Sequence, residues 1–466
     1  MKKITPVLAL VVVLCAGPTL AKDTTPEEIR KEAREIFQKV IAFRSSEGLG
    51  QVPAMAQYLA ERFRAAGFPE KDIHILPSGE TASLVVRYPG NGRGGKPILL
   101  LAHMDVVTAK PEEWERDPFT LIEENGYFFG RGTLDNKQGV TVLTSTFMRL
   151  KREGFVPTRD LVIAFSGDEE TGMVTTTELA TKYRNLTEAE YALNSDDGGG
   201  QLDEKTGKPQ YLSFVGAEKI SATYELTVRN PGGHSSAPRA DNAVYELADA
   251  LKAMQAYRFP VMSNDWTLGS FKATGPVTAG PLGEAMTRFA ANPKDEAAAA
   301  ALAAVPTEVG KTRTTCVATM LRGGHASNAL PQTATATVSC RIFPGTAVEE
   351  VQAKLQELVG KKVEVRSLGN TPPADASPLR KDVMAALTKA THARYPGIPV
   401  VPAMVPWATD GAIFRSNGIP TYGVSGSMIK ASDAFSHGLN ERLPVESFYG
   451  ELTHWYLLLK ELAGKR

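Results

Sequence analysis

The stretch ILLLAHMD, residues 98–105, decides the fold of this chain. Its apolar run from Ile98 to Leu101 is typical of a strand buried on both faces, and His103 and Asp105 follow where the strand ends. In open α/β sheets, ligands bind beyond the carboxyl ends of the strands, where loops from different strands meet. The stretch therefore predicts a mostly parallel sheet that carries its chemistry at this edge.

Four other segments place acidic or histidine residues in comparable positions. They are Asp135 in the glycine-punctuated turn GRGTLDNKQG (130–139), Glu169 and Glu170 after the apolar run Leu161 to Phe165, Asp196 and Asp197 after Tyr191 to Leu193, and His437 in SHGLNE (436–441). Any one of them alone also fits an ordinary charged turn or loop. Zinc and similar dications take imidazole and carboxylate ligands, and a bridging carboxylate is the simplest way to hold two such ions close together. The whole set therefore predicts a site for two metal ions.

The residue types predict separate roles within this set. Asp105 can accept a hydrogen bond from the imidazole nitrogen of His103 that does not bind metal, which fixes the tautomer of the ring. Of Glu169 and Glu170, one is expected to bind metal and the other to act as general base. Either of the two aspartates after Tyr191 to Leu193 could be a ligand.

One further histidine lies outside the set. His234, in NPGGHSSAP (230–238), sits at a junction between a strand and a turn whose glycines allow close approach of the backbone. We interpret it as an oxyanion donor that is delivered when domains or subunits close; the alternative is a turn histidine on the surface. The other histidines have no such context and are expected to be surface or core residues: His74, His325, His392 and His454.

The length and the apolar pattern predict two domains. About 445 residues of mature chain exceed what one hydrophobic core usually supports. Strand-like and helical runs alternate up to residue 217, and helices resume from residue 369, so residues 22–217 and 369–466 are expected to form an α/β catalytic domain with a mixed, mostly parallel sheet flanked by helices. Its first helix is indicated by a capping box at Thr25 and Glu28.

Residues 218–368 are expected to form a second domain inserted into the first, which we call the lid. Its predicted elements are an alternating strand from Ile220 to Val228, a helix from Asn242 to about Met254, a strand from Thr333 to Ile342, a helix from Val348 to Val359 and a strand from Val363 to Val365. This order indicates a small α+β domain of ferredoxin-like type. The lid also carries an insertion from about Pro260 to Thr312, where a fourth strand could lie and where Asp295 to Val305 is expected to be helical.

The amino terminus has the features of a secretory signal peptide. Two lysines precede a mostly apolar stretch from Ile4 to Ala16, and we expect cleavage after Ala21. Because this stretch is shorter than the roughly 20 residues that span a membrane, we expect an exported, periplasmic protein without a membrane anchor. Only Cys316 and Cys340 remain after cleavage. We expect them to be two small buried hydrophobic residues rather than a disulfide.

The charge balance excludes some partners. The chain has 52 basic and 52 acidic residues, and no segment concentrates lysine or arginine. Binding to nucleic acid or to an anionic membrane surface would need a basic stripe. We therefore expect neither partner.

Together the motifs resemble the co-catalytic zinc metallopeptidase family of carboxypeptidase G, aminoacylase, carboxypeptidase S and succinyl-diaminopimelate desuccinylase. They occur in the family's order over nearly the whole mature chain, and the lid falls where the family has it. The resemblance implies two zinc ions, for which cobalt or manganese could substitute. It places His103 and Asp197 on one ion, Glu170 and His437 on the other, and Asp135 between them, with a cis peptide bond before Asn136.

The resemblance also assigns the remaining residues. It makes Glu169 the general base, His234 a residue that acts across a homodimer interface formed by the lid, and Asn328 and Arg341 substrate-binding residues. The implied activity is hydrolysis of an amide or peptide bond, in which a hydroxide held by the two zinc ions attacks the carbonyl carbon. Small peptides and N-acyl amino acids are both expected substrates, so carboxypeptidase, dipeptidase and aminoacylase activities all remain open.

Three departures from the family pattern and two alternatives accompany this prediction. Asp196 stands beside Asp197, so the ligand could shift by one residue; the lid carries the long insertion; and Ala408 in WATDG (407–411) stands where many relatives have glycine. The alternatives are an aminopeptidase of the related type that lacks the lid, and a non-catalytic zinc-binding protein of the same fold. The predicted lid argues against the first, and the complete set of ligands and base argues against the second.

Overall fold

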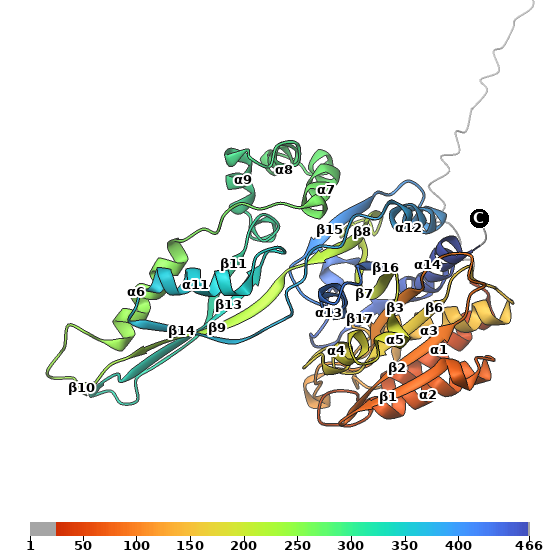
Figure 1. Ribbon diagram of the computed structural model, residues 1–466, viewed down its shortest axis with the longest axis horizontal. Coiled ribbons are helices and arrows are strands. Elements are labelled where there is room, and N and C mark those ends of the chain that lie inside the picture. Colours follow the sequence, from red (N-terminus) through yellow and green to blue (C-terminus); the bar gives the residue numbers. More distant parts are fainter. Residues whose placement is uncertain (1–24, 465–466) are drawn as a thin grey trace, which may run out of the picture.

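The computed structural model of the protein describes residues 25–464 (Figure 1). The proposed signal peptide lies outside these residues. Within the described part of the chain, no helix combines the length and the apolar character needed to cross a membrane.

An eight-stranded sheet forms the centre of the catalytic domain. In spatial order its strands are β1 (Ile73–Ser78), β2 (Thr81–Tyr88), β6 (Leu161–Ser166), β3 (Ile98–His103), β7 (Tyr191–Leu202), β16 (Thr421–Lys430), β8 (Pro209–Glu218) and β15 (Val400–Val405). The central strand β3 pairs in parallel with both β6 and β7. The predicted mixed, mostly parallel sheet is therefore confirmed, and the carboxyl ends of β3, β6 and β7 meet at one edge.

Helices cover both faces of this sheet (Figure 1). One face packs against α1 (Glu27–Ala42), α2 (Val52–Ala65), α3 (Lys137–Arg152), α12 (Lys381–Arg394) and α14 (Val445–Ala463). The other packs against α4 (Val174–Ala180), α5 (Arg184–Thr187) and α13 (Asp410–Ser416). In β3, Leu100 belongs to the first core, whereas Leu99 and Leu101 belong to the second. Because successive strand side chains point to opposite faces, the run is apolar throughout, as a doubly covered strand requires.

The first helix forms where it was predicted, but its cap differs. The N-cap of α1 is Pro26, and no side chain makes a capping hydrogen bond. Thr25 instead places its Oγ1 atom 2.7 Å from Oγ1 of Thr453 in α14. This tertiary contact replaces the expected capping box, and the helix is held mainly by its buried apolar face.

The lid contains a four-stranded antiparallel sheet covered on one face by two helices. Its elements are β9 (Ile220–Arg229), α6 (Ala243–Ala256), β11 (Thr315–Gly323), β13 (Thr333–Ile342), α11 (Val348–Val359) and β14 (Val363–Asn370), and the strand order is β11-β13-β9-β14. This order, with the helices between the strands, is the ferredoxin-like arrangement. The fourth strand, β11, follows the insertion rather than lying within it. The presence of the lid does not fit the alternative of an aminopeptidase without this domain.

The insertion forms helices, the first of which packs against the catalytic domain. They are α7 (Asp265–Thr274), α8 (Pro281–Ala291), α9 (Glu296–Ala303) and α10 (Pro306–Val309). In α7 the buried Trp266 ring lies 5.0 Å from the ring of Phe214 on β8, and its Nε1 atom donates a 2.7 Å hydrogen bond to the carbonyl oxygen of Ser377. A Cβ atom at Gly216 would lie 1.9 Å from the indole, so only glycine leaves room for it. The insertion thus ties the lid to the central sheet.

The two cysteines of the described chain form a disulfide, so the expectation of unpaired buried residues is wrong. Cys316 on β11 and Cys340 on β13 are bonded, and their Cα atoms are 4.1 Å apart because the strand register places them opposite each other. That register depends on β11, which the sequence did not locate. The bond fixes the outermost strand of the lid sheet to its neighbour.

Candidate metal centre

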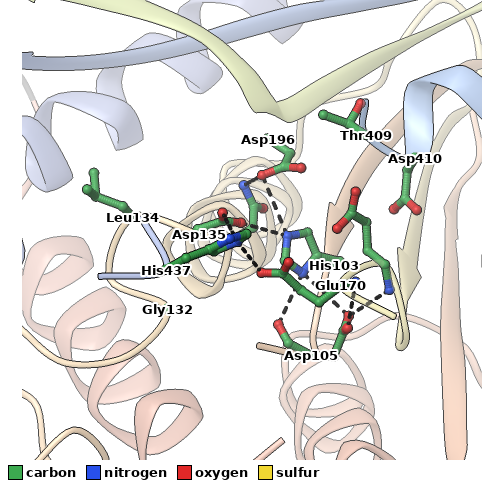
Figure 2. A network of polar contacts seen from close by, with 12 residues as sticks. His103, Asp105, Gly132, Leu134, Asp135, Glu170, Asp196, Thr409, Asp410 and His437 are labelled. Atoms are coloured by element: carbon green, nitrogen blue, oxygen red, sulfur yellow. Dashed lines mark hydrogen bonds and ion pairs between the residues drawn. The ribbon is translucent and has the colours of Figure 1, made fainter. Parts of the chain in front are cut away.

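His103 occupies the last position of β3 and is fully buried. Its Nε2 atom lies 2.9 Å from Oδ1 of Asp135 and 3.6 Å from Oδ1 of Asp196 (Figure 2). Its Nδ1 atom lies 3.1 Å from the backbone oxygen of Asp105 and 3.4 Å from Oδ1 of the same residue. One ring nitrogen therefore faces the carboxylates, and the other is oriented by Asp105, with the closer contact to its backbone oxygen rather than to the carboxylate expected from the sequence.

The Asp105 side chain has a second structural role that the sequence did not reveal. Its two oxygens accept hydrogen bonds from the backbone N–H groups of Glu169 (3.1 Å) and Glu170 (3.0 Å). The carboxylate thus fixes the turn after β6 against the end of β3. Substituting Asp105 would displace both the histidine and the glutamates.

Asp135 lies between two histidines. Its Oδ1 atom faces His103, and its Oδ2 atom lies 3.1 Å from Nε2 of His437. The peptide bond to Asn136 is cis, as the resemblance implied. His437 also lies 2.9 Å from Oε1 of Glu170 (Figure 2). The two oxygens of one carboxylate therefore face two separate groups of candidate metal ligands. This is the geometry that a bridging ligand needs.

Asp196, rather than Asp197, points into this cluster. Asp196 accepts a 2.9 Å hydrogen bond from the side chain of Asn136 and faces His103. The Oδ1 atom of Asp197 accepts a hydrogen bond from the backbone N–H of Gly198, and its buried Oδ2 atom has no hydrogen-bond partner among the described residues. The expected position of this ligand was therefore off by one residue, because neighbouring residues of β7 point to opposite sides of the strand.

Glu169 lies in the cluster beside His103 and Glu170, with ligand atoms of all three within 4.8 Å of one another. Its side chain is only 9% exposed. Burial raises the pKa of the Glu169 carboxyl group well above its ordinary value, and the nearby carboxylates of Asp196 and Asp410 act in the same direction. A raised pKa makes the carboxylate a stronger base, which suits a group that takes up and returns a proton during a reaction.

The electrostatics of the cluster fit bound cations. Burial raises the pKa of Asp196 to about 7, and the negative charge of Asp135 adds to this effect. Burial lowers the pKa of His103, but Asp196 and its other carboxylate neighbours outweigh burial and raise that pKa well above its ordinary value. Burying this many carboxylates costs free energy unless positive charge lies among them. Two candidate donor sets share Asp135: His103 with Asp196, and Glu170 with His437. This arrangement fits two divalent ions.

A buried acid that sequence reasoning missed holds the Asp135 loop in place. Glu441 is 0% exposed and accepts hydrogen bonds from the backbone N–H groups of Leu134 (2.7 Å), Gly132 (3.2 Å) and Asp135 (3.2 Å). It also pairs with the buried guanidinium of Arg131 at 2.7 Å. In the sequence, Glu441 resembles any acidic loop residue four positions after His437, so no local signal identified it.

The late segment WATDG supports the ends of two central strands. Asp410, fully buried, accepts a 2.6 Å hydrogen bond from the hydroxyl of Ser166 at the end of β6. Thr409 accepts one at 2.9 Å from the side-chain amide of Asn194 on β7 and donates one at 2.9 Å to Glu218. These contacts fix the two strand ends that carry the glutamates and Asp196.

The lid residues that the family resemblance assigns to the site lie outside the metal cluster in this chain. The exposed His234 is on β10 (Gly233–His234), and the backbone oxygen of Asn328 accepts a 3.0 Å hydrogen bond from the N–H of Ser235 beside it. Figure 1 shows β10 at the end of the lid remote from the catalytic domain. Arg341 lies near the opposite end of β13, paired with Ser221 and Thr315. The single chain therefore does not bring His234 or Asn328 to the metal cluster.

A cavity of about 330 Å³ opens beside the cluster. Asn136, Asp196 and Trp407 contribute to its wall, together with the glycine run Gly198 to Gly200. The Trp407 side chain is half exposed, which makes a mixed polar and apolar surface next to the candidate metal ligands. The cavity provides room for a small organic substrate.

Comparison with known proteins agrees with this geometry. The model of peptidase family M20/M25/M40 matches residues 99–461. N-fatty-acyl-amino acid synthase/hydrolase PM20D1 of Xenopus tropicalis is 32% identical over 373 residues, which cover 78% of this chain and 72% of the relative. Aminoacylase-1 of Mus musculus is 27% identical over 421 residues, covering 87% and 89%.

The fold is also shared with solved structures. The M20 family metallo-carboxypeptidase Sso-CP2 from Sulfolobus solfataricus superposes with a TM-score of 0.70 at 20% identity, covering 92% of this chain and 99% of that one. The dipeptidase Dug1p from Saccharomyces cerevisiae gives a TM-score of 0.65 at 17% identity, covering 94% and 97%. With the family model matching most of the chain, the protein is a hydrolase of amide or peptide bonds and belongs to peptidase family M20/M25/M40.

Proposed function

We propose that the protein hydrolyses the amide bond of N-acyl amino acids, with two zinc ions bound between His103, Asp135, Glu170, Asp196 and His437. The observation that carries this proposal is the Asp135 carboxylate, whose two oxygens face two different histidines. Two of its relatives support the substrate class, since one is named for N-fatty-acyl-amino acids and another is an aminoacylase. Cobalt and manganese accept the same ligands and would substitute for zinc.

The chain supplies the proton chemistry. When bound, the two ions would activate a water molecule and polarise the amide carbonyl. Glu169 stands beside both donor sets and has no side-chain hydrogen bond among the described residues, so its carboxylate can take a proton from the attacking water. The same carboxyl group then delivers that proton to the leaving amine nitrogen. Asp105 holds the backbone of Glu169 throughout, which keeps the base in position.

The Glu169→Gln variant tests this role. The amide keeps the size of the side chain but cannot take up the proton, so we expect normal metal content and a turnover lowered by at least about 10²-fold, the usual range for a general base. A variant with full metal content and near-normal turnover would refute the assignment. Asp249→Asn, on the exposed side of α6, is the matched control for handling and expression.

We propose further that the lid forms a homodimer interface along β11. This strand lies at the edge of the lid sheet, and its side chains Val317, Met320 and Leu321 are 61%, 50% and 66% exposed. An open edge with exposed apolar side chains favours pairing with a second copy. A dimer of this kind would allow His234 of one subunit to reach the metal cluster of the other, where its imidazole would stabilise the oxyanion.

We also propose export to the periplasm with cleavage after Ala21. The disulfide between Cys316 and Cys340 supports an oxidising compartment, because such bonds seldom persist in the cytosol. Amino-terminal sequencing of the protein from the periplasmic fraction should begin at Lys22. Recovery in the cytoplasmic fraction with Met1 still present would contradict export.

A further inference from the structure

The junction between the lid and its inserted helices contains four basic side chains that pair with no acid of residues 25–464. They are Lys219, Arg258, Arg313 and Arg341, and none forms an ion pair with any carboxylate of the described residues. Two acids of this region pair with other cations: Glu308 pairs with Lys311 at 2.9 Å, and Glu218 pairs with Arg415 at 2.7 Å. Burial lowers the pKa of Lys219 to about 7, so the three arginines carry the uncompensated positive charge of the junction.

Arg313 is the most unusual member of this group. It is only 8% exposed, its Nε atom has no hydrogen-bond partner, and its guanidinium group donates no hydrogen bond within residues 25–464. Burial and the neighbouring charge of Arg258 lower its pKa. A buried guanidinium without partners costs free energy, and such groups in folded proteins are normally paired or hydrogen-bonded. An anionic ligand would satisfy it.

Arg313 lines a cavity of about 190 Å³ whose wall combines polar side chains with an apolar side. The apolar residues come from the end of α6, from the insertion and from α11: Met254, Phe259, Ala303, Val309, Leu355 and Leu358. The exposed Arg258 also contributes to the wall. Cys316 lies in the same wall, so the disulfide to Cys340 fixes this side of the cavity. A second cavity, of about 270 Å³, shares Val309 and Thr315 with the first.

We propose that this junction cavity binds an amphiphilic carboxylate of the fatty-acid type. The carboxylate would pair with Arg313 and Arg258, and the hydrocarbon chain would lie against the apolar walls. None of the cavity-lining residues belongs to the metal cluster, so the site does not depend on the proposed hydrolysis. A ligand here would contact both the lid and the inserted helices that rest on the catalytic domain, and would hold the two together.

Calorimetric titration of the zinc-loaded mature protein with octanoate tests the proposal. We expect one saturable site that acetate and 1-octanol do not occupy at the same concentrations, because acetate lacks the chain and octanol lacks the charge. Arg313→Leu should weaken octanoate binding by at least about tenfold, whereas Arg313→Lys should retain most of it. Arg322→Leu is the matched control, since Arg322 is an exposed arginine of the lid that does not line the cavity.

Photolabelling distinguishes octanoate bound in the junction cavity from octanoate bound at the metal cluster. Photolysis of a diazirine-bearing octanoate on the wild-type protein should label peptides that contain Met254 to Phe259 or Leu355 to Leu358. Label confined to the catalytic domain, or equal octanoate affinity in wild type and Arg313→Leu, would overturn the proposal. If Arg313→Leu does not fold, the exposed Arg258→Gln provides the same comparison, with a loss of several-fold expected.

Discussion

The buried carboxylate of Glu441 accepts a hydrogen bond from the backbone N–H of Asp135, 3.2 Å away. The same carboxylate holds Leu134 and Gly132, so it fixes the loop that presents Asp135 between the two histidines. Glu441 acts through Asp135 and does not itself face the donor sets. It is a positioning residue for the metal centre.

Glu441→Gln should therefore weaken metal binding without abolishing the chemistry. We expect zinc affinity to fall by about 10- to 100-fold, the range found when partners of metal ligands are changed. Excess zinc should restore most of the turnover. Competition with a chelator measures the affinity, and a variant that binds zinc normally would show that the loop holds Asp135 without Glu441.

The same substitution should also lower stability. It leaves the buried guanidinium of Arg131 without its charged partner, and losing one member of a buried pair costs about 3 kcal/mol or more. Urea unfolding of the metal-free protein should show this loss separately from the loss of bound zinc. An unchanged midpoint would mean that the ion pair adds nothing to the fold.

Asp135→Asn should remove the second metal ion. An amide offers one oxygen and a weaker, neutral donor, so it cannot serve both donor sets as the carboxylate does. We expect fewer than two zinc ions per chain by elemental analysis and a turnover lowered by more than about 10³-fold. Two ions and substantial turnover would contradict the bridging role. Asp249→Asn on α6 again provides the control.

Comparing Asp196→Asn with Asp197→Asn identifies the ligand of β7. Because only Asp196 faces His103, we expect Asp196→Asn to lose zinc and activity. Asp197→Asn should retain both and unfold at a similar or higher denaturant concentration, because burial raises the pKa of Asp197 and its Oδ2 atom has no partner within residues 25–464. The reverse pattern would assign the metal to Asp197.

Mixing two inactive variants tests the proposed dimer. His234→Ala lacks the oxyanion donor, and Glu169→Gln lacks the base, so each homodimer should be poorly active. In a mixed dimer, the subunit with intact Glu169 receives His234 from its partner, and we expect activity to return toward about one quarter of the wild-type value after subunit exchange. No recovery, in a sample shown by ultracentrifugation to be dimeric, would contradict the transfer of His234 between subunits.

The buried His454 makes stability depend on pH. Its Nε2 atom lies 2.9 Å from the carbonyl oxygen of Val424, and burial lowers its pKa from 6.5 to about 4. Between these values the unfolded chain binds a proton that the folded protein excludes, so the stabilisation is complete above pH 6.5 and is lost as the pH falls toward 4. The urea midpoint should therefore fall more steeply from pH 7 to pH 5 in wild type than in His454→Gln. Parallel plots of urea midpoint against pH for the two proteins would show that His454 does not cause this pH dependence.

The sequence identified most of the metal centre because the candidate residues directly follow strands that are buried on both faces. The run before His103 and the run before Glu169 are apolar throughout, which located both strands and the edge at which they meet. His437 was found only as part of the set, since its own loop carries no local signal. The motif order then indicated the family.

The remaining features depend on tertiary contacts that no local pattern encodes. The choice between Asp196 and Asp197 follows from how β7 turns its side chains at the strand end. Glu441 is buried only because its loop folds over the Asp135 turn. The disulfide depends on the register of β11 with β13, and the position of Trp266 against Phe214 depends on the path of the insertion.

The most direct test of the two-metal hydrolase is a zinc titration of the metal-free mature protein during hydrolysis of an N-acyl amino acid. We predict no turnover without metal, with turnover rising to a plateau at two zinc ions per chain. Turnover that is independent of added metal, or a protein that binds two ions and hydrolyses no N-acyl amino acid, would contradict the proposed function.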